Sequence, residues 1–123
     1  MTWIAVLLGG LVGAVARQEI FSRVQQRAQT PFPVGIMVVN LTGAFALGLL
    51  HGSEILDEAP RWLSLALEVG AVGAFTTYST WALDSLRLHE EQRKIMAWTN
   101  LIGSLTAAVT LVWIGIYLGQ ALH

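Results

Sequence analysis

The chain has 123 residues, of which 54% are hydrophobic and 12% are charged, and its mean hydropathy is +0.60. The charges gather between long uncharged runs, whereas a soluble helical domain carries charge on every helix. A net charge of -1 without a basic stripe argues against a nucleic-acid partner, and the absence of cysteine excludes disulfides and thiol chemistry. The composition therefore predicts a membrane protein.

Four segments approach the roughly 20 apolar residues that a transmembrane helix needs. They cover about residues 3–23, 33–51, 61–86 and 95–122, and polar, charged or proline-containing stretches separate them. No basic segment precedes the first apolar run, so no cleavable signal peptide is predicted. We expect an all-α membrane protein with one domain, 1–123. A chain this short cannot cover all of its own polar groups, which predicts an oligomer.

Small residues recur at helical spacing in the first, second and fourth spans, where they would let helix backbones approach closely. The stripes are Gly10, Gly13, Ala14 and Arg17 in the first span, Asn40, Gly43, Ala44 and Gly48 in the second, and Asn100, Gly103, Ser104 and Ala107 in the fourth. The amides and hydroxyls on these stripes either join helices or line a polar path. Interhelical hydrogen bonds are worth only about 0.6 to 2 kcal/mol in membranes.

The third span contains the stretch Gly70-Ala-Val-Gly73-Ala-Phe-Thr76-Thr77-Tyr78-Ser79-Thr80-Trp81. Hydroxyl-rich or irregular backbone is tolerated at membrane depth only where it is buried in protein or lines a polar cavity. We interpret this stretch as the wall of a transport path. Its donors, together with Asn40, Asn100 and Ser104, are neutral, and the two aromatic rings add positive edges. A donor-rich lining without a ring of carboxylates favours a small anion.

Two acidic residues lie in the third span. Glu68 either faces an aqueous vestibule, pairs with an arginine such as Arg17, or has a function of its own, since an intramembrane acid is a functional candidate by default. Asp84 fits a vestibule or interface position. The sequence has no paired nucleophile and base and no phosphate-cradling loop, so an enzyme is not predicted.

Several of these features together resemble the Fluc-type fluoride channels, also called the CrcB or camphor-resistance family. They are Asn40-Leu-Thr-Gly, the early Gly-x-x-Gly-x-x-x-Arg17, the third-span stretch and Ser104. The resemblance covers nearly the whole chain. Its most specific part is the third-span motif, of which the chain keeps Gly73, Thr76, Thr77, Ser79 and Thr80.

The resemblance implies two four-helix subunits packed antiparallel, each with its third helix broken in mid-membrane, enclosing two fluoride pores and a central structural sodium ion. It implies that backbone carbonyls at Gly73 and Thr76 surround the sodium ion. The implied function is passive export of cytoplasmic fluoride. The implied pore residues are Asn40, Thr77, Tyr78, Ser79, Trp81 and Ser104.

The chain departs from the family pattern at three residues of the motif. Tyr78 and Trp81 stand where phenylalanine is usual, which would strengthen fluoride binding, obstruct the pore or mark an inactive pore. Ala74 replaces the second glycine of the motif, which would tighten or shift the break in the helix.

Basic residues are unevenly distributed between the two sides of the predicted bundle. Loop one follows the first predicted span and loop three follows the third. Even when Arg17 and Arg87 are not counted, because they could be buried in the membrane, these two loops carry four basic residues and the other side has only Arg61. The positive-inside rule therefore predicts that loops one and three are cytoplasmic and that both termini are outside. We expect a plasma-membrane protein of a microbe, either an antiparallel homodimer or a fixed-orientation subunit paired with an oppositely inserted homologue.

The sequence is also compatible with two other functions. A proton-coupled small multidrug transporter has a similar size and assembly, but Glu68 would have to replace the carboxylate that this class carries in its first span. A non-conducting structural subunit of a heterodimeric fluoride channel is the second alternative.

Overall fold

The structure is a computed structural model that describes residues 1–122, and every regular element among these residues is helical. Two π-helical segments, η1 and η2, interrupt the α-helices. The elements are α1 (Thr2–Ala28), α2 (Val34–Ser53), α3 (Arg61–Leu65), η1 (Ala66–Val72), α4 (Gly73–Phe75), α5 (Tyr78–Glu90), α6 (Lys94–Trp98), η2 (Thr99–Gly103) and α7 (Ser104–Ala121).

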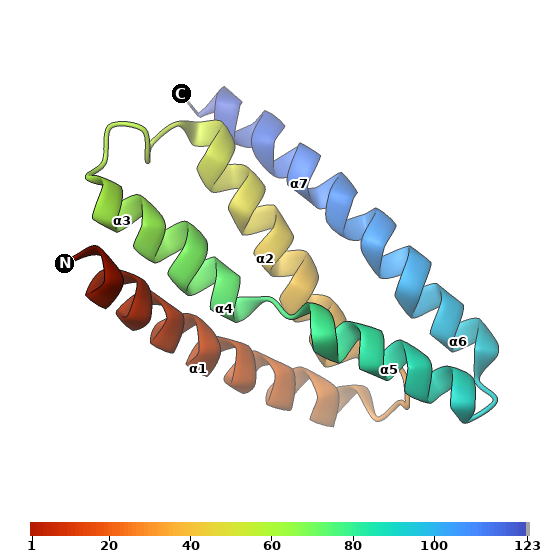
Figure 1. Cartoon of the computed structure of the whole chain (residues 1–123). Coiled ribbons are helices and arrows are strands. Elements are labelled where there is room, and N and C mark those ends of the chain that lie inside the picture. Colours follow the sequence, from red (N-terminus) through yellow and green to blue (C-terminus); the bar gives the residue numbers. More distant parts are fainter. Residues whose placement is uncertain (123) are drawn as a thin grey trace.

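The chain makes four passes along one bundle (Figure 1). The first pass is α1, the second is α2, the third runs from α3 to α5, and the fourth runs from α6 to α7. The loops between the first two and the last two passes lie at the same end of the bundle. The loop between the second and third passes lies at the other end, where the N-terminus also lies. This up-and-down arrangement agrees with the four helices expected from the sequence.

Among residues 1–122, three helices are long and apolar enough to cross a membrane: Thr2–Ala28, Val34–Ser53 and the continuous stretch Lys94–Ala121. The third pass falls outside this set because its helical backbone stops after Phe75 and starts again at Tyr78. Its overall extent, from Arg61 to Glu90, is nevertheless comparable to that of the other passes.

Two helices extend beyond their predicted ends because polar residues continue them. The helix α1 runs to Ala28 rather than about residue 23, and the exposed pair Glu19 and Arg23 supports its polar end with an Nη2 to Oε2 distance of 3.2 Å. The helix α5 runs to Glu90 rather than about residue 86, with Arg87 lying 3.6 Å from Asp84.

Glycines set the closest contacts between passes. The most extensive packing joins α2 to α7 and α1 to η1. A Cβ atom on Gly115 would lie 2.6 Å from the carbonyl oxygen of Phe45, and one on Gly70 would lie 2.6 Å from that of Val6. Real Cβ atoms essentially never approach so closely, so these backbones can meet only because glycine has no side chain. The expectation that small residues lie at helix contacts is confirmed for Gly13, which faces η1, and the neighbouring Gly9 faces η1 as well.

Large apolar side chains cover the outside of the bundle. Trp3 is 82% exposed, Leu7 72% and Trp113 68%, whereas the fully buried large side chains are only Leu88, Val39 and Asn100 among the residues described. A water-soluble protein would bury such side chains, and lipid is the solvent that accepts them. The outward apolar faces therefore agree with a membrane protein.

The predicted stripe of the fourth pass is only partly correct. Asn100 and Ser104 are buried, but Gly103 is exposed. The reason is η2, because its i to i+5 hydrogen bonds shift the helical phase that a 3.6-residue period assumes.

Candidate functional site

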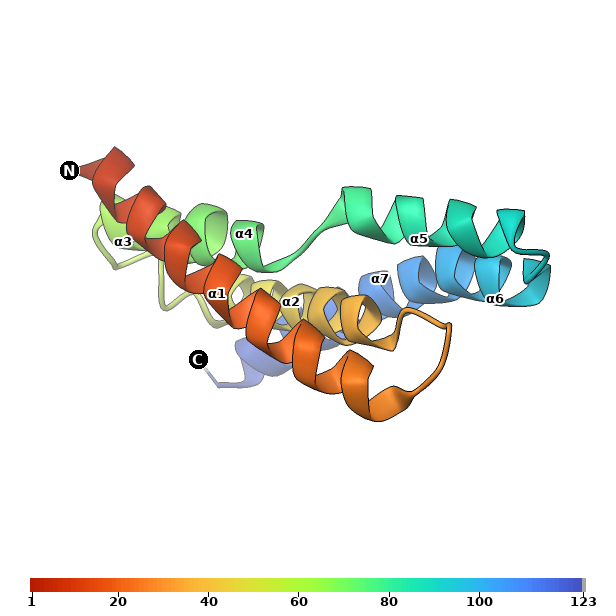
Figure 2. The same cartoon turned by 90° about the horizontal axis from the view of Figure 1, so that it is seen from below.

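The helical backbone of the third pass is interrupted at Thr76 and Thr77 (Figure 2). Thr76 has φ -88° and ψ 158°, and Thr77 has φ -146° and ψ 124°, so both residues are extended. No donor among residues 1–122 bonds to the carbonyl oxygens of residues 73–76, and the N–H groups of Tyr78 and Ser79 have no acceptor there. The interruption therefore exposes a group of oxygen acceptors beside a pair of N–H donors.

Asn40 on α2 holds the interruption in place. Its Nδ2 donates to the carbonyl oxygen of Thr77 at 2.9 Å, and the N–H of Thr77 donates to its Oδ1 at 2.8 Å. An extended residue presents its N–H and C=O to the same side, so one side-chain amide can satisfy both, as a neighbouring β-strand would. The second proton on Nδ2 remains available for a ligand.

Gly43, one helical turn after Asn40, gives the interruption room. A Cβ atom on Gly43 would collide with Cγ2 of Thr76 and lie 3.2 Å from Cδ1 of Phe75. Thr76 is also fixed from its own side, because its N–H and its Oγ1 both donate to the carbonyl oxygen of Val72, at 3.1 and 3.2 Å. The extended conformation of Thr76 thus depends on contacts with α2 and with the end of η1.

Thr77 caps the helix that follows. Its Oγ1 accepts a hydrogen bond from the N–H of Thr80 at 3.4 Å and lies 3.2 Å from the Thr80 hydroxyl oxygen. The free N–H groups of Tyr78 and Ser79 belong to the first turn of α5, where the helix dipole is positive. This end of the interruption therefore favours negative charge.

A cavity of about 370 Å³ opens beside the interruption. Of the predicted pore residues, Asn40, Thr77, Tyr78, Trp81 and Ser104 line it, and so do the predicted sodium positions Gly73 and Thr76. The remaining wall comes from Glu68 and from the small and apolar residues Gly43, Ala44, Leu47, Val72, Leu105, Ala108 and Val112. The structure thus brings together residues from α2, the third pass and α7.

Trp81 faces this cavity with its indole nitrogen turned into the protein. Its Nε1–H donates to the carbonyl oxygen of Asn100 at 3.0 Å. The indole therefore offers the cavity only ring faces and C–H edges. The added N–H donor that the sequence suggested for position 81 is used in joining α5 to η2.

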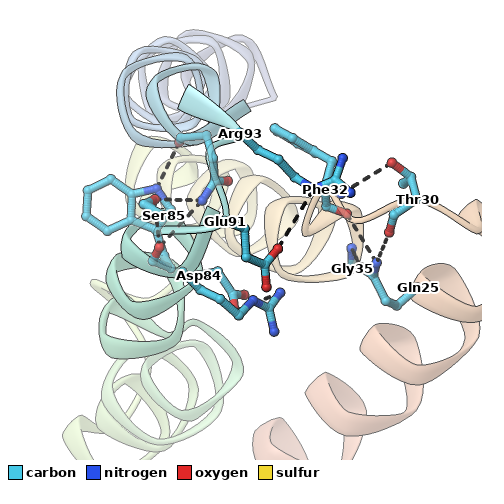
Figure 3. Close-up of polar contacts among 11 residues, drawn as sticks. Gln25, Thr30, Phe32, Gly35, Asp84, Ser85, Glu91 and Arg93 are labelled. Carbon is cyan, nitrogen blue, oxygen red and sulfur yellow. Dashed lines mark hydrogen bonds and ion pairs between the residues drawn. The ribbon is translucent and has the colours of Figure 1, made fainter. Parts of the chain in front are cut away.

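Asn100 is fully buried and organises the contact between α5 and the fourth pass. Its Nδ2 donates to Oγ of Ser85 at 2.8 Å and to the carbonyl oxygen of Trp81 at 3.4 Å (Figure 3 shows Ser85 among these contacts). Its Oδ1 accepts from the hydroxyl of Ser104 at 3.2 Å. Asn100 and Ser104 are thus bonded within the protein, and the hydroxyl proton of Ser104 is directed at Asn100.

Tyr78 is the most exposed aromatic residue of the cavity wall, at 78%. Its ring packs at a tilt against that of Trp81, with centroids 5.1 Å apart and planes 53° apart. The structure shows no hydrogen bond to its hydroxyl group from residues 1–122. Tyr78 therefore has the freedom to meet a ligand or a second subunit.

Glu68 lies on the cavity wall because η1 has more residues per turn than an α-helix. The N–H of Gly73 donates to the carbonyl oxygen of Glu68, an i to i+5 bond. This spacing places Glu68 and Gly73 on one face, and both line the cavity together with Thr77. Nothing among residues 1–122 forms an ion pair or hydrogen bond with the Glu68 carboxylate, so the suggested pairing with Arg17 is absent from the structure.

Three predicted candidates do not line this cavity. Ser79 is exposed on α5. Arg17 lies on α1, and the Asp84 carboxylate pairs with Arg87 rather than with a residue of the cavity wall.

Ser85, by contrast, was not singled out from the sequence, although it accepts a hydrogen bond from Asn100. It lies one turn after Trp81, and that spacing is the signal that links it to the aromatic motif.

Gln25 fixes loop one, the segment that joins α1 to α2 (Figure 3). Its Nε2 donates to the carbonyl oxygens of Thr30 and Phe32 at 3.2 and 3.1 Å, and its Oε1 accepts from the N–H of Gly35 at 2.9 Å. This amide links the end of α1 to the start of α2. It thereby helps set the position of α2, which carries Asn40.

Comparison with known proteins matches residues 4–116 to the family model of CrcB-like, camphor-resistance proteins. The chain is 38% identical over 122 residues to a fluoride-specific ion channel, FluC 1, of Streptomyces avermitilis, covering 99% of this chain and 98% of that one. It is 41% identical over 118 residues to FluC 2 of Mycolicibacterium paratuberculosis, covering 96% and 93% of the two chains. A fluoride-specific ion channel of a Geobacter species is 36% identical over 123 residues. The chain belongs to the CrcB family.

Proposed function

We propose that this chain is a subunit of a fluoride-selective channel through which cytoplasmic fluoride leaves the cell passively. The observation that carries the proposal is the cavity in which Asn40 holds the extended Thr77 beside the aromatic pair Tyr78 and Trp81. The names of the relatives as fluoride-specific ion channels support the choice of ion.

The cavity is suited to a small, strongly hydrated anion. Fluoride crosses a pore only if closely placed donors replace its hydration water. The second Nδ2 proton of Asn40, the first N–H groups of α5 and the positive ring edges of Tyr78 and Trp81 are such donors. We propose that Ser104 and Thr77 take part by exchanging their internal hydrogen bonds for the ion, and that Ser79 lies at the entrance.

We further propose a structural sodium ion at the interruption. Sodium prefers oxygen ligands, and the carbonyl groups of Gly73 and Thr76 have no hydrogen-bond donor among residues 1–122. Neutral main-chain oxygens freed by a broken helix fit this ion without a dedicated side chain. The ion would supply positive charge beside a path for anions.

The proposed assembly is antiparallel, with a second four-helix subunit of the same family covering the interruption. Exposed main-chain carbonyls are not tolerated against lipid, so protein or water has to meet them. The excess of basic residues on loops one and three favours a fixed orientation with these loops in the cytoplasm. That orientation favours an oppositely inserted homologue over a second copy as partner. The channel would reside in the plasma membrane of a microbe.

Glu68 gives one observation in favour of a second function. A proton-coupled transporter of organic cations needs a membrane-embedded carboxylate, and Glu68 lines the cavity. The donors around Asn40 argue for the channel, because they suit an anion.

A growth assay separates the two functions. The gene is expressed in a bacterium that lacks its own fluoride exporter. Where the genome of the source organism holds a second gene of the same family, that gene is coexpressed as the partner. The channel predicts growth in fluoride that is lost with Asn40→Asp and retained with Glu68→Gln in a sodium-rich medium. Resistance to organic cations that is lost with Glu68→Gln would instead establish the transporter.

A further inference from the structure

We infer that Glu68 provides the negative charge that retains a monovalent cation at the interruption of the third pass. The inference rests on the sodium site proposed above and adds a side chain to it. Glu68 is the one carboxylate among the residues that line the cavity.

The geometry of η1 brings Glu68 to the part of the cavity wall that contains the proposed sodium ligands, the carbonyl oxygens of Gly73 and Thr76. Because η1 has i to i+5 hydrogen bonds, Glu68 precedes Gly73 by one turn on the same face. A Cβ atom built on Gly73 has the carbonyl oxygen of Glu68 as its nearest contact, at 3.8 Å, so no bulky group separates the two residues. Glu68 thus lies one turn before the carbonyl groups that lack donors.

The surroundings of Glu68 give its carboxylate no partner within residues 1–122. The ion pairs described join Glu19 to Arg23, Asp84 to Arg87 and Glu91 to Arg93, all of them away from this cavity. An uncompensated carboxylate at membrane depth is costly. A bound cation removes that cost and satisfies the free carbonyl oxygens together with the carboxylate.

The cavity is therefore divided in charge preference. The side formed by Glu68 and by the carbonyl oxygens of Gly73 and Thr76 attracts a cation. The side formed by Asn40 and the first turn of α5 attracts an anion. A cation retained by Glu68 also prevents the carboxylate from repelling fluoride in the neighbouring path.

The test is the sodium dependence of thermal unfolding, measured on the purified assembly in lipid discs. Sodium chloride replaces N-methylglucamine chloride at constant ionic strength, and the melting temperature is followed as a function of sodium concentration. A ligand that binds only the folded state raises the melting temperature as its concentration exceeds its dissociation constant. For the wild-type protein we expect a melting temperature that is constant at low sodium concentration and then rises with the logarithm of sodium concentration, so the onset of the rise reports the dissociation constant.

Glu68→Gln is expected to raise the sodium concentration at which the melting temperature begins to rise by about tenfold or more, because attraction between neighbouring opposite charges contributes at least this factor in a protein environment. Glu68→Asp keeps the charge and is expected to stay within about threefold of the wild-type protein. Glu58→Gln removes an exposed carboxylate outside the cavity and is the matched control.

The outcomes separate this inference from the proposals on which it rests. A wild-type rise that Glu68→Gln leaves at the same sodium concentration would overturn the role of Glu68 and leave the sodium site standing. A wild-type protein without any sodium response would overturn both, whereas fluoride efflux measured on the same preparation tests the channel independently. If Glu68→Gln fails to fold, Glu68→Ala takes its place, with Glu58→Ala as its control. A sodium concentration at onset within about threefold of that control would then overturn the role of Glu68.

Discussion

The side-chain amide of Asn40 pairs with both main-chain polar groups of Thr77, at 2.9 Å and 2.8 Å, across 37 residues of sequence. This pair joins α2 to the one place where the third pass is not helical. It satisfies backbone groups that would otherwise lack a hydrogen-bond partner, and it places the amide on the wall of the cavity. We therefore expect substitutions of Asn40 to affect both stability and ion passage.

Asn40→Asp is expected to abolish most of the fluoride flux. The substitution replaces the Nδ2 donor with a carboxylate oxygen that faces the Thr77 carbonyl oxygen and repels the anion. We expect a loss of about 1 to 3 kcal/mol in the free energy of unfolding and a fall of at least about tenfold in flux. Gln26→Glu, the same change of amide to acid on an exposed part of α1, is the control. Equal flux in both variants would contradict the role of Asn40.

Gly43→Ala tests the packing of the interruption against α2. The new methyl group would collide with Thr76, so we expect a destabilisation of about 1 to 3 kcal/mol and a reduced flux. Gly103→Ala places its methyl group 3.8 Å from Cγ2 of Thr99, which is ordinary contact, and should leave the protein as stable or slightly more stable. Chemical denaturation in detergent measures both. Equal effects would show that Gly43 is not needed for close packing.

Trp81→Phe tests whether the indole N–H has a structural rather than an ion-binding role. The variant loses the hydrogen bond to the Asn100 carbonyl oxygen, which should cost about 0.5 to 1.5 kcal/mol, and keeps an aromatic edge at the cavity. We expect fluoride flux within about threefold of the wild-type value. Trp98→Phe, at a half-exposed residue without such a bond, is the control. A large loss of flux with unchanged stability would assign the N–H to the ion instead.

The orientation of the chain is tested with single cysteines, which is straightforward because the protein has none of its own. Cysteine is introduced at Gln92, between the third and fourth passes, or at Asp57, between the second and third. An impermeant thiol reagent applied to intact cells should label Asp57→Cys and spare Gln92→Cys. Labelling of both to the same extent would show dual insertion and favour a homodimer.

Much of the fold follows from the sequence because lipid imposes a simple rule. Long apolar runs must form helices that satisfy their own backbone, so the four passes and most of the small residues at their contacts were predicted correctly, with Gly103 as the exception. The ends of α1 and α5 were placed too early, since polar residues after an apolar run continue a helix as readily as they end it. The π-helices were not predicted, because one extra residue per turn leaves no compositional signal.

The cavity residues were largely predicted from their chemistry, but their bonding was not. Asn40, Thr77, Tyr78, Trp81 and Ser104 lie together as expected. The sequence could not show that the Trp81 N–H and the Ser104 hydroxyl are used within the protein, because that depends on Asn100, which approaches α5 only after the fourth pass folds back. Side-chain type indicates which bonds are available, whereas the partner is decided by tertiary packing.

The most direct test of the central claim is fluoride efflux from liposomes that contain the assembly purified through this chain. A fluoride electrode follows the release, a potassium ionophore clamps the membrane potential, and chloride release is measured in parallel. The account predicts fast fluoride efflux, chloride efflux near the background, and at least about a tenfold loss of fluoride efflux with Asn40→Asp in a folded assembly. Absence of fluoride efflux from the folded wild-type assembly, or efflux that Asn40→Asp leaves unchanged, would contradict it.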